Sequence, residues 1–387
     1  MKKTLIINDV APPVVQGGAI MLGKYLEHFP VDSFSILTAK TGKEKIVDNQ
    51  RALKGKYFFP DKQSYNGLNP IIYNISVLCD VLFISLKGLW IVKKEKIDNI
   101  LALSNRGAYL VSAFFIAKLM HRNFFIFFTD AYEQLPRYKI EKVMQRLLEK
   151  PMLKSAEKLF VLNEFLAGHY SQKYRIRPEV LPVPIETKLD TVPTAAMSAQ
   201  ENRTTKKIVF TGMVYWAQME AIKNLTDVVN SLNDGRVKLF IYTASAPEEL
   251  RKQGIRGGNI KICFAPRKEL GDICKQADIL FLPLSFNVPY PLLIKTASTT
   301  KLPEYLAAGR PILVHAPRDS FVSYYAEKEG FGYVVCDNSP GQLKEAVLRL
   351  LEDRVLQENL VKNALRTVYN HDARRLSKRL SKYLLNN

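Results

Sequence analysis

The stretch that decides the fold is Thr299–Ile312, which reads T-T-K-L-P-E-Y-L-A-A-G-R-P-I. Two hydroxyl residues lead into apolar residues at helical spacing, a pattern that predicts a short helix over residues 301–308. Gly309 is the expected helix-ending residue, and Pro311 blocks continuation of the helix. The apolar residues 312–315 then predict a strand, so the segment is a loop, helix and strand of an α/β protein.

The N-terminal end of this helix is suited to a phosphate group. A helix N-terminus offers unpaired N–H groups and a partial positive charge, and Ser298, Thr299 and Thr300 add hydroxyl donors. Glu304 lies one turn into the helix, where it is placed to accept hydrogen bonds from both ribose hydroxyls of a nucleotide. The alternative interpretation is an ordinary loop, helix and strand with a glutamate on the surface.

Three further segments flank this motif. Ala277–Pro283 reads A-D-I-L-F-L-P and predicts the preceding strand, Val209–Gly212 reads V-F-T-G, and Pro266–Leu270 reads P-R-K-E-L. Together with Thr299–Ile312 they resemble, in order and spacing, the donor domain of GT-B-fold glycosyltransferases of the family 4 (glycosyl transferases group 1) type. The resemblance implies an enzyme that binds a nucleotide sugar.

The resemblance is specific over residues 207–316, where it implies the donor site. Gly212 stands at the turn after the first strand of this domain, and the backbone at Pro266 is expected near the nucleobase. The expected donor-binding residues are Gly212, Pro266, Lys295, Ser298, Thr299, Thr300, Lys301 and Glu304.

Two positions depart from the family pattern. A glutamate eight positions before Glu304 normally contacts the transferred sugar, but this position holds Thr296. An arginine and a lysine usually follow the strand–glycine turn, whereas Gly212 is followed here by M-V-Y-W-A-Q. We therefore expect Lys295 or Lys301 to supply the positive charge for the phosphates.

The first half of the chain resembles the same family more loosely. Val10–Gly18 reads V-A-P-P-V-V-Q-G-G and resembles the loop that closes over donor and acceptor, with Gly17 and Gly18 allowing close backbone approach. A plain turn before a helix is the alternative. Phe127–Asp130 ends an apolar strand where related enzymes carry a polar motif near the reacting sugar. Asp130 is therefore the candidate catalytic residue, with a helix-capping aspartate as the alternative.

Strand-like and helix-like segments alternate along the chain, which predicts parallel sheets with helices on both faces. We expect an α/β protein of the GT-B class, with two doubly wound Rossmann-like domains, a cleft between them and a C-terminal helix returning to the first domain. The expected boundaries are 1–185 for the acceptor-binding domain, 186–206 for the linker, 207–360 for the donor-binding domain and 361–387 for the C-terminal helix.

The net charge of +19 is unevenly distributed. Residues 1–185 hold 27 Lys and Arg against 16 Asp and Glu, residues 361–387 hold 7 against 1, and the residues between hold 22 against 20. This asymmetry indicates an anionic partner for one domain. Val81–Lys96 and Tyr138–Lys158 mix basic with apolar residues, so we expect an anionic membrane surface and no nucleic acid. A soluble, merely basic enzyme is the alternative.

Other features indicate the compartment. The four cysteines are far apart and form no C-x-x-C pair, which predicts reduced thiols of a cytosolic protein. No signal-peptide pattern opens the sequence. Val77–Val92, the longest apolar segment, has 16 residues and falls short of the roughly 20 needed to cross a bilayer. We therefore expect a cytoplasmic protein, peripherally associated with the inner face of the membrane.

The sequence predicts no metal site and no cofactor. The five histidines share no metal-ligand spacing and D-x-D is absent, so we expect metal-independent turnover. The resemblance implies transfer, with retention, of a sugar from a nucleotide sugar to a carbohydrate or lipid-linked acceptor in surface polysaccharide assembly. Two alternatives are a nucleotide-sugar epimerase of the same fold and an inactive donor-binding subunit of a glycosyltransferase complex, which Thr296 keeps open.

Overall fold

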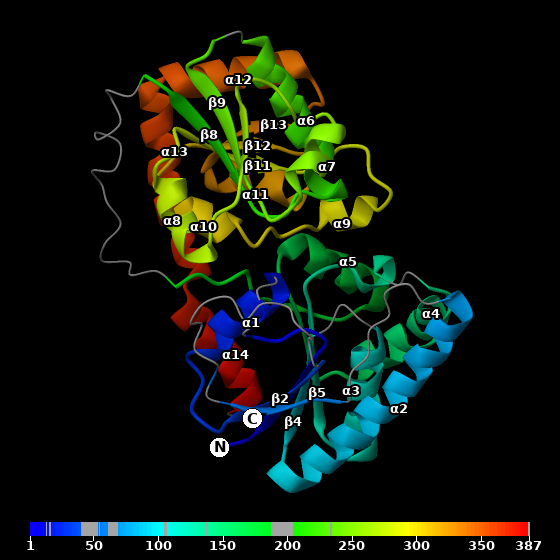
Figure 1. The fold of residues 1–387 in the computed structure, drawn as a ribbon. Helices are drawn as coiled ribbons and strands as arrows, with labels where there is room; N and C mark the ends of the chain where they lie inside the picture. The colour runs from blue at the N-terminus through cyan, green and yellow to red at the C-terminus, as the bar shows by residue number, and fades with distance from the viewer. Residues whose placement is uncertain are drawn as a thin grey trace. The chain divides into compact units, whose positions relative to one another are not determined.

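The computed structural model folds into two α/β units (Figure 1). Unit 1 comprises Met1–Glu186 and Ala373–Asn387, and unit 2 comprises Thr187–Asp372. The structure describes residues 1–12, 14, 17–39, 53, 55–60, 69–103, 107–135, 138–186, 204–232 and 234–385.

Unit 1 is built on a parallel sheet in the order β3-β2-β1-β4-β5-β6-β7. The order reverses between β1 and β4, and ligands of doubly wound folds bind at the carboxyl ends of strands near such a switch point. The strands are β1 (Thr4–Asn8), β2 (Phe34–Thr38), β3 (Lys56–Phe58), β4 (Asn99–Leu103), β5 (Asn123–Phe128), β6 (Lys158–Val161) and β7 (Glu179–Val180).

Helices cover both faces of this sheet (Figure 1). They are α1 (Gly17–Leu26), α2 (Pro70–Glu95), α3 (Gly107–Leu119), α4 (Lys139–Ser155), α5 (Glu164–Tyr174) and α14 (Ala373–Leu385), with a 3-10 turn at Tyr132–Gln134.

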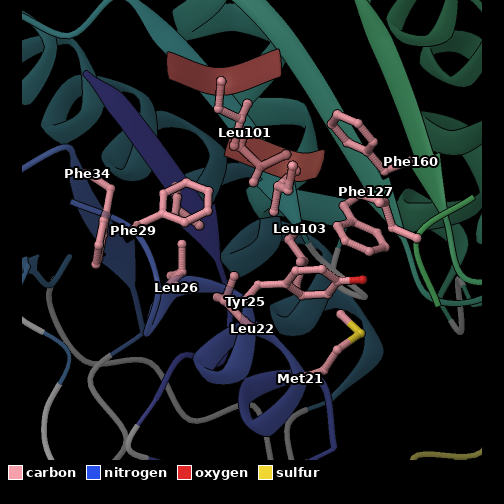
Figure 2. Packing of buried hydrophobic residues seen from close by; sticks show 14 of the residues in the cluster. Met21, Leu22, Tyr25, Leu26, Phe29, Phe34, Leu101, Leu103, Phe127 and Phe160 are labelled. Atoms are coloured by element: carbon pink, nitrogen blue, oxygen red, sulfur yellow. The ribbon is translucent and has the colours of Figure 1, made fainter. Parts of the chain in front are cut away.

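The two faces of the unit 1 sheet are covered by different helices. On one face, α1 and α14 share an apolar cluster with the strands, in which the Tyr25 and Phe127 rings meet edge to face at 5.7 Å (Figure 2). On the other face, Phe114 of α3 contacts Phe124 of β5, with ring centroids 6.1 Å apart. Since successive strand residues point to opposite faces, α3 lies on the side of the sheet opposite α1 and α14.

Unit 2 is built on a second parallel sheet, in the order β10-β9-β8-β11-β12-β13, whose switch point lies between β8 and β11. Its strands are β8 (Lys206–Thr211), β9 (Val237–Tyr242), β10 (Ile260–Cys263), β11 (Ile279–Pro283), β12 (Ile312–His315) and β13 (Gly332–Val335). Its helices are α6 (Trp216–Ser231), α7 (Pro247–Lys252), α8 (Arg267–Lys275), α9 (Pro291–Lys295), α10 (Leu302–Ala307), α11 (Phe321–Glu329), α12 (Pro340–Glu352) and α13 (Arg354–Thr367), and a 3-10 turn spans Val368–His371.

The C-terminal segment divides at residue 373 rather than at 361. Residues 361–372 cluster with unit 2, because α13 buries Leu360, Val361 and Ala364 there. Only α14 joins unit 1, where Ser377 Oγ donates a hydrogen bond of 2.6 Å to the backbone carbonyl of Tyr25. Residues 187–203 of the expected linker lie outside the described residues.

Helix α2 is longer than the sequence pattern indicated. Asn69 caps it by accepting a hydrogen bond of 2.9 Å from Ile71 N, and Pro70 occupies the first turn, so the helix begins seven residues before Val77. It has 26 residues and is, within the described part of the chain, the one helix long and apolar enough to cross a membrane. The expectation that the longest apolar segment is too short to span a bilayer is therefore wrong in its length. A third of the most apolar window of α2 is buried in the protein.

Candidate functional site

The carboxyl edge of the unit 2 sheet brings a glycine turn against a lysine. Gly212 follows β8 with a backbone φ of +115°, a conformation that side-chain-bearing residues rarely adopt. A Cβ atom at this position would lie 3.3 Å from Lys301 Cε and 3.4 Å from Lys301 Nζ. The turn therefore favours glycine at Gly212, and the end of the Lys301 side chain lies beside it.

Lys301 is held in an environment that disfavours its charge. It lies at the start of α10, and its Nζ lies 3.9 Å from the centroid of the Phe210 ring. Burial lowers the pKa of Lys301 to about 7, although the nearby Glu304 and Cys274 act in the opposite direction. An anionic ligand beside Lys301 would favour its protonated form, so this lysine is suited to phosphate oxygens.

Glu304 pairs with an arginine that the sequence analysis did not single out. Arg267 Nη2 lies 2.7 Å from Glu304 Oε1, and both side chains are partly buried. Arg267 is the first residue of α8, directly after Pro266, which caps that helix. The pair therefore places the P-R-K-E-L turn beside the helix that carries Glu304. These are the two segments expected to bind the nucleoside part of the donor.

Buried polar contacts fix α10 against the first strand of the unit. Thr211 N donates a hydrogen bond of 2.9 Å to Tyr305 Oη. Burial raises the pKa of Tyr305 well above its usual value and raises the pKa of Cys274 to about 12, so both side chains are neutral. Tyr305 and Cys274 are thus neutral side chains close to Lys301 and Glu304. The sequence analysis gave neither of them a role.

The hydroxyl turn before α10 leads directly into this cluster. Ser298 and Thr299 are partly buried and Thr300 is exposed. Thr299 Oγ1 is itself buried and has no hydrogen-bond partner in the described part of the chain. Helix α10 spans six residues, two fewer than expected, because Lys301 serves as its N-cap and Ala308 as its C-cap. Gly309 follows with a φ of +67°, as expected of a helix-ending glycine.

Two other residues of this region lie outside the cluster. Lys295, at the end of α9, has an exposed side chain whose Nζ lies 3.9 Å from Asp319 Oδ2. Of the two lysines proposed for the phosphates, the structure therefore places Lys301 and not Lys295 beside Gly212. Thr296 is buried, and its Oγ1 donates a hydrogen bond of 2.8 Å to the carbonyl of Leu292. The position where the family carries its first glutamate is thus a buried helix-end residue here.

The candidate residues of unit 1 lie after β1 and after β5. Gly17 and Gly18 begin α1, and a Cβ atom at Gly18 would meet no other atom within 4 Å, so that backbone is open. Pro13, Val15 and Gln16 of the expected closing loop lie outside the described residues. Asp130 follows β5, accepts a hydrogen bond of 3.0 Å from Thr129 Oγ1, and has its pKa raised by burial.

Titratable side chains in the described ranges form no metal cluster. No three or more His, Cys, Asp or Glu residues are grouped there so as to hold a metal ion. The polar groups at this edge of unit 2 are the Lys301 amine, the Thr299 hydroxyl and the Glu304 carboxylate with its partner Arg267. This set complements the phosphates and ribose of a nucleoside diphosphate.

Comparison with known proteins places this site inside a recognised domain. Residues 205–353 match the family model described as Glycosyl transferases group 1. No curated protein sequence matches the chain. A glycosyltransferase from Rickettsia africae has a similar structure, with 15% identity and a TM-score of 0.68 over 100% of this chain and 99% of that chain.

Two further solved structures match over 100% of both chains. HepE from Anabaena in complex with UDP-glucose has 14% identity and a TM-score of 0.71. WaaG, a glycosyltransferase involved in lipopolysaccharide biosynthesis, has 15% identity and a TM-score of 0.64. At these identities the likeness establishes the fold across the whole chain, and the family model identifies the domain that carries the candidate site. The chain therefore has the GT-B fold, and its residues 205–353 are similar to the glycosyl transferases group 1 domain.

Proposed function

We propose that this enzyme transfers a sugar, with retention of configuration, from a nucleotide sugar to a carbohydrate or lipid-linked acceptor of surface polysaccharide assembly. The observation that carries the proposal is the cluster of Lys301, Glu304 and Arg267 at the carboxyl edge of the unit 2 sheet. HepE was solved with UDP-glucose, and WaaG acts in lipopolysaccharide biosynthesis, which supports this class of donor and of product.

The proposed roles follow from charge. Lys301, protonated when a diphosphate arrives, stabilises the negative charge that develops on the leaving phosphate as the bond to the sugar breaks. Glu304 accepts hydrogen bonds from the ribose hydroxyls, and Arg267 holds its carboxylate in place. The acceptor hydroxyl loses its proton as its oxygen bonds to the sugar, and we assign Asp130 as the acceptor of that proton, because burial makes its carboxylate more basic.

One observation favours a second candidate function. Thr296 is buried and bonded to Leu292, so it supplies no carboxylate to the sugar side of the site. An inactive donor-binding subunit of a glycosyltransferase complex would keep the nucleotide contacts and lack this group. The nucleotide contacts themselves are the same in both cases.

Nucleotide release distinguishes the candidates. The full chain is incubated with UDP-, GDP-, TDP- and CMP-sugars, with and without a carbohydrate or lipid-linked acceptor, and free nucleotide is measured together with the sugar product. The transferase predicts release that depends on the acceptor. Conversion of the donor sugar without an acceptor would indicate an epimerase, and nucleotide binding without any turnover would indicate an inactive subunit.

We also propose that the enzyme works at the inner face of an anionic membrane. Unit 1 carries 32 Lys and Arg against 17 Asp and Glu, which gives it +15 of the total charge of +19. A positive field of this size attracts the protein to acidic lipids, and added salt weakens that attraction.

A further inference from the structure

The outer face of α2 is apolar although it is exposed. Eight large apolar residues recur along it, and each has between 45% and 69% of its surface exposed. A surface helix normally carries polar or charged residues on this side. We call the set the α2 stripe; it consists of Ile71, Ile72, Ile75, Leu78, Leu82, Phe83, Leu86 and Trp90.

The inner face of α2 is packed against the rest of unit 1. Val77, Ile84 and Ile91 are buried, and they recur every seven residues along the helix. At Gly88 a Cβ atom would lie 2.2 Å from Ile116 Cδ1, so α2 and α3 approach as closely as glycine allows. The inner face of α2 is therefore covered by unit 1. Only the stripe on its outer face can contact lipid, so α2 can lie on a membrane surface but is not surrounded by lipid.

The charges around the stripe have one sign. Helices α2, α3 and α4 are described over their full length, and their four acidic residues, Asp80, Glu95, Glu141 and Glu149, are all buried. Their basic residues are exposed, apart from the partly buried Lys87. The exposed ones are Lys93, Lys94, Lys118, Lys139, Lys142, Arg146, Lys150 and Lys154. The outer side of this helical layer is therefore apolar and basic.

Trp90 joins the apolar and basic parts of this surface. Lys94 Nζ lies 4.4 Å from the centre of its ring, and Lys87 Nζ lies 4.9 Å away. An indole flanked by ammonium groups at the end of an apolar stripe is the arrangement that suits the boundary between acyl chains and headgroups.

The basic residues of α14 belong to a different surface. Helix α14 packs with α1 on one face of the unit 1 sheet, whereas α2 packs on α3, which covers the opposite face (Figure 1). One of these basic residues, Arg379, is paired with Glu179 within unit 1. A flat membrane that contacts the α2 stripe therefore does not also contact the outer side of α14.

We propose that the α2 stripe embeds in the headgroup region of an anionic bilayer, with the surrounding lysines and arginines on lipid phosphates, and that α14 takes no part. This inference names the element behind the membrane association proposed above and is independent of glycosyl transfer. A second copy of the chain fits the stripe less well, because it would bring more exposed basic residues of α2, α3 and α4 and no exposed acidic residue of these helices to pair with them. An interfacial helix buries its apolar face about 5–10 Å below the surface, a depth that the position of Trp90 can report.

The first experiment uses tryptophan fluorescence. The sequence contains two tryptophans, so Trp216→Phe leaves Trp90 as the single reporter. We expect vesicles of phosphatidylcholine with phosphatidylglycerol to shift Trp90 emission to the blue, and acyl-brominated lipids to quench it. Co-sedimentation with these vesicles without quenching would overturn the proposal, because it would show that another surface is bound.

The second experiment compares matched variants by co-sedimentation. Leu82→Gln, Phe83→Gln and Leu86→Gln together remove apolar contacts from the stripe, and Val355→Gln of unit 2, also at an exposed apolar site, is the control. Lys87→Gln, Lys93→Gln and Lys94→Gln remove three charges, and Arg374→Gln, Lys378→Gln and Lys382→Gln remove the same charge from α14. We expect each α2 variant to lose roughly tenfold or more in affinity for acidic vesicles, and the α14 variant to bind as the unmodified chain does.

Three outcomes of this comparison would overturn the inference. Loss of binding in the α14 variant alone would assign the contact to α14 and leave the broader membrane proposal standing. Equal losses in both charge variants, with no loss in the apolar variant, would show attraction by net charge only. If the unmodified chain forms a dimer and does not bind vesicles, and the apolar variant is a monomer, a second copy of the chain covers the stripe. Thermal unfolding of each variant, all changed at exposed or partly exposed positions, checks that the fold is kept.

Discussion

The two units share one architecture, but each departs from the usual pattern of apolar residues inside and charged residues outside in a different way. Unit 2 partly buries ionisable side chains, with Lys301 over the Phe210 ring and Glu304 paired with Arg267. Unit 1 leaves large apolar side chains of α2 in water and buries the acidic residues of the same helical layer. Both arrangements cost free energy in the isolated chain. The difference indicates two partners of different chemistry, a compact anion for unit 2 and an extended anionic lipid surface for unit 1.

The position of each feature in its unit agrees with this difference. The charged cluster of unit 2 lies at the carboxyl ends of the strands, near the switch point between β8 and β11, where parallel sheets bind small ligands. The α2 stripe lies instead along the exposed side of a helix that packs on α3. A small ligand is held by a few groups that converge, whereas a membrane needs a long row of groups facing one way.

The largest effect is expected for Lys301→Met. Removing the cation should weaken binding of nucleoside diphosphates by roughly 10- to 100-fold, because a hydrogen bond to a charged group contributes about 1.5–3 kcal/mol. The same change should raise the free energy of unfolding of the unliganded chain, since a buried amine is replaced by an apolar side chain. Calorimetric titration and thermal unfolding measure the two quantities.

Lys295→Met is the matched control for that variant. Lys295 lies six residues earlier, is exposed, and pairs with Asp319 instead of approaching Gly212. Its loss should leave diphosphate affinity nearly unchanged. A loss of affinity in Lys295→Met equal to that in Lys301→Met would contradict the placement of the phosphates beside Lys301.

A smaller effect is expected for Glu304→Gln. The variant keeps the size of the side chain but removes its charge, so nucleotide affinity should fall by about tenfold through the weakened hydrogen bonds to ribose. Arg267→Gln should weaken binding less, because Arg267 touches the carboxylate and not the ligand in the proposed arrangement. Unchanged nucleotide affinity in Glu304→Gln would remove Glu304 from the site.

The sequence predicted those site residues that local motifs mark, and it missed a contact between residues far apart in the chain. Gly212, Lys301 and Glu304 were identified because local motifs mark turns and helix starts, and the structure brings Gly212 and Lys301 together. Arg267 was present in a quoted motif, but only its backbone environment was considered. Its pairing with Glu304 spans 37 residues and depends on how α8 and α10 pack, which no local pattern contains.

The fold class followed from the alternation of strands and helices, whereas two boundaries did not. The start of α2 was missed because Tyr73, Asn74 and Ser76 break the apolar run before Val77, although Asn69 and Pro70 together form a helix start. The exposure of the α2 stripe was also not predictable, since an apolar sequence at helical spacing does not show which side meets the domain. The crossover at residue 373 was missed because α13 and α14 are both helical and carry similar residues.

The pH dependence of unit 2 gives a third test of the comparison. The pKa of Lys301 is about 7 in the folded chain and about 10.4 when the lysine is free in water. Between these values the unfolded chain binds more protons, so this group makes the free energy of unfolding rise with pH across that window. The difference between the unmodified chain and Lys301→Met, measured by denaturant unfolding from pH 7 to pH 10, isolates the contribution.

Ligand binding should shift the same equilibrium. A diphosphate beside Lys301 raises its pKa, so binding near pH 8 should take up a fraction of a proton from the buffer. Calorimetry in two buffers of different ionisation enthalpy measures this uptake. Uptake that is the same in Lys301→Met would mean that another group receives the proton, and would separate the phosphate site from this lysine.

The smallest effect is expected for metal removal. The sequence carries no D-x-D, and the proposed site already places the Lys301 amine and the hydroxyls of Ser298, Thr299 and Thr300 where a bridging metal would otherwise balance the phosphate charge. We therefore expect EDTA to leave nucleotide release from the donor unchanged in the unmodified chain. Activity abolished by EDTA and restored by magnesium or manganese would show that the lysine and hydroxyl groups of unit 2 do not suffice for the leaving diphosphate. Such a result would also weaken the contrast between the units, because a metal ion and not Lys301 would then balance the charge of the diphosphate in unit 2.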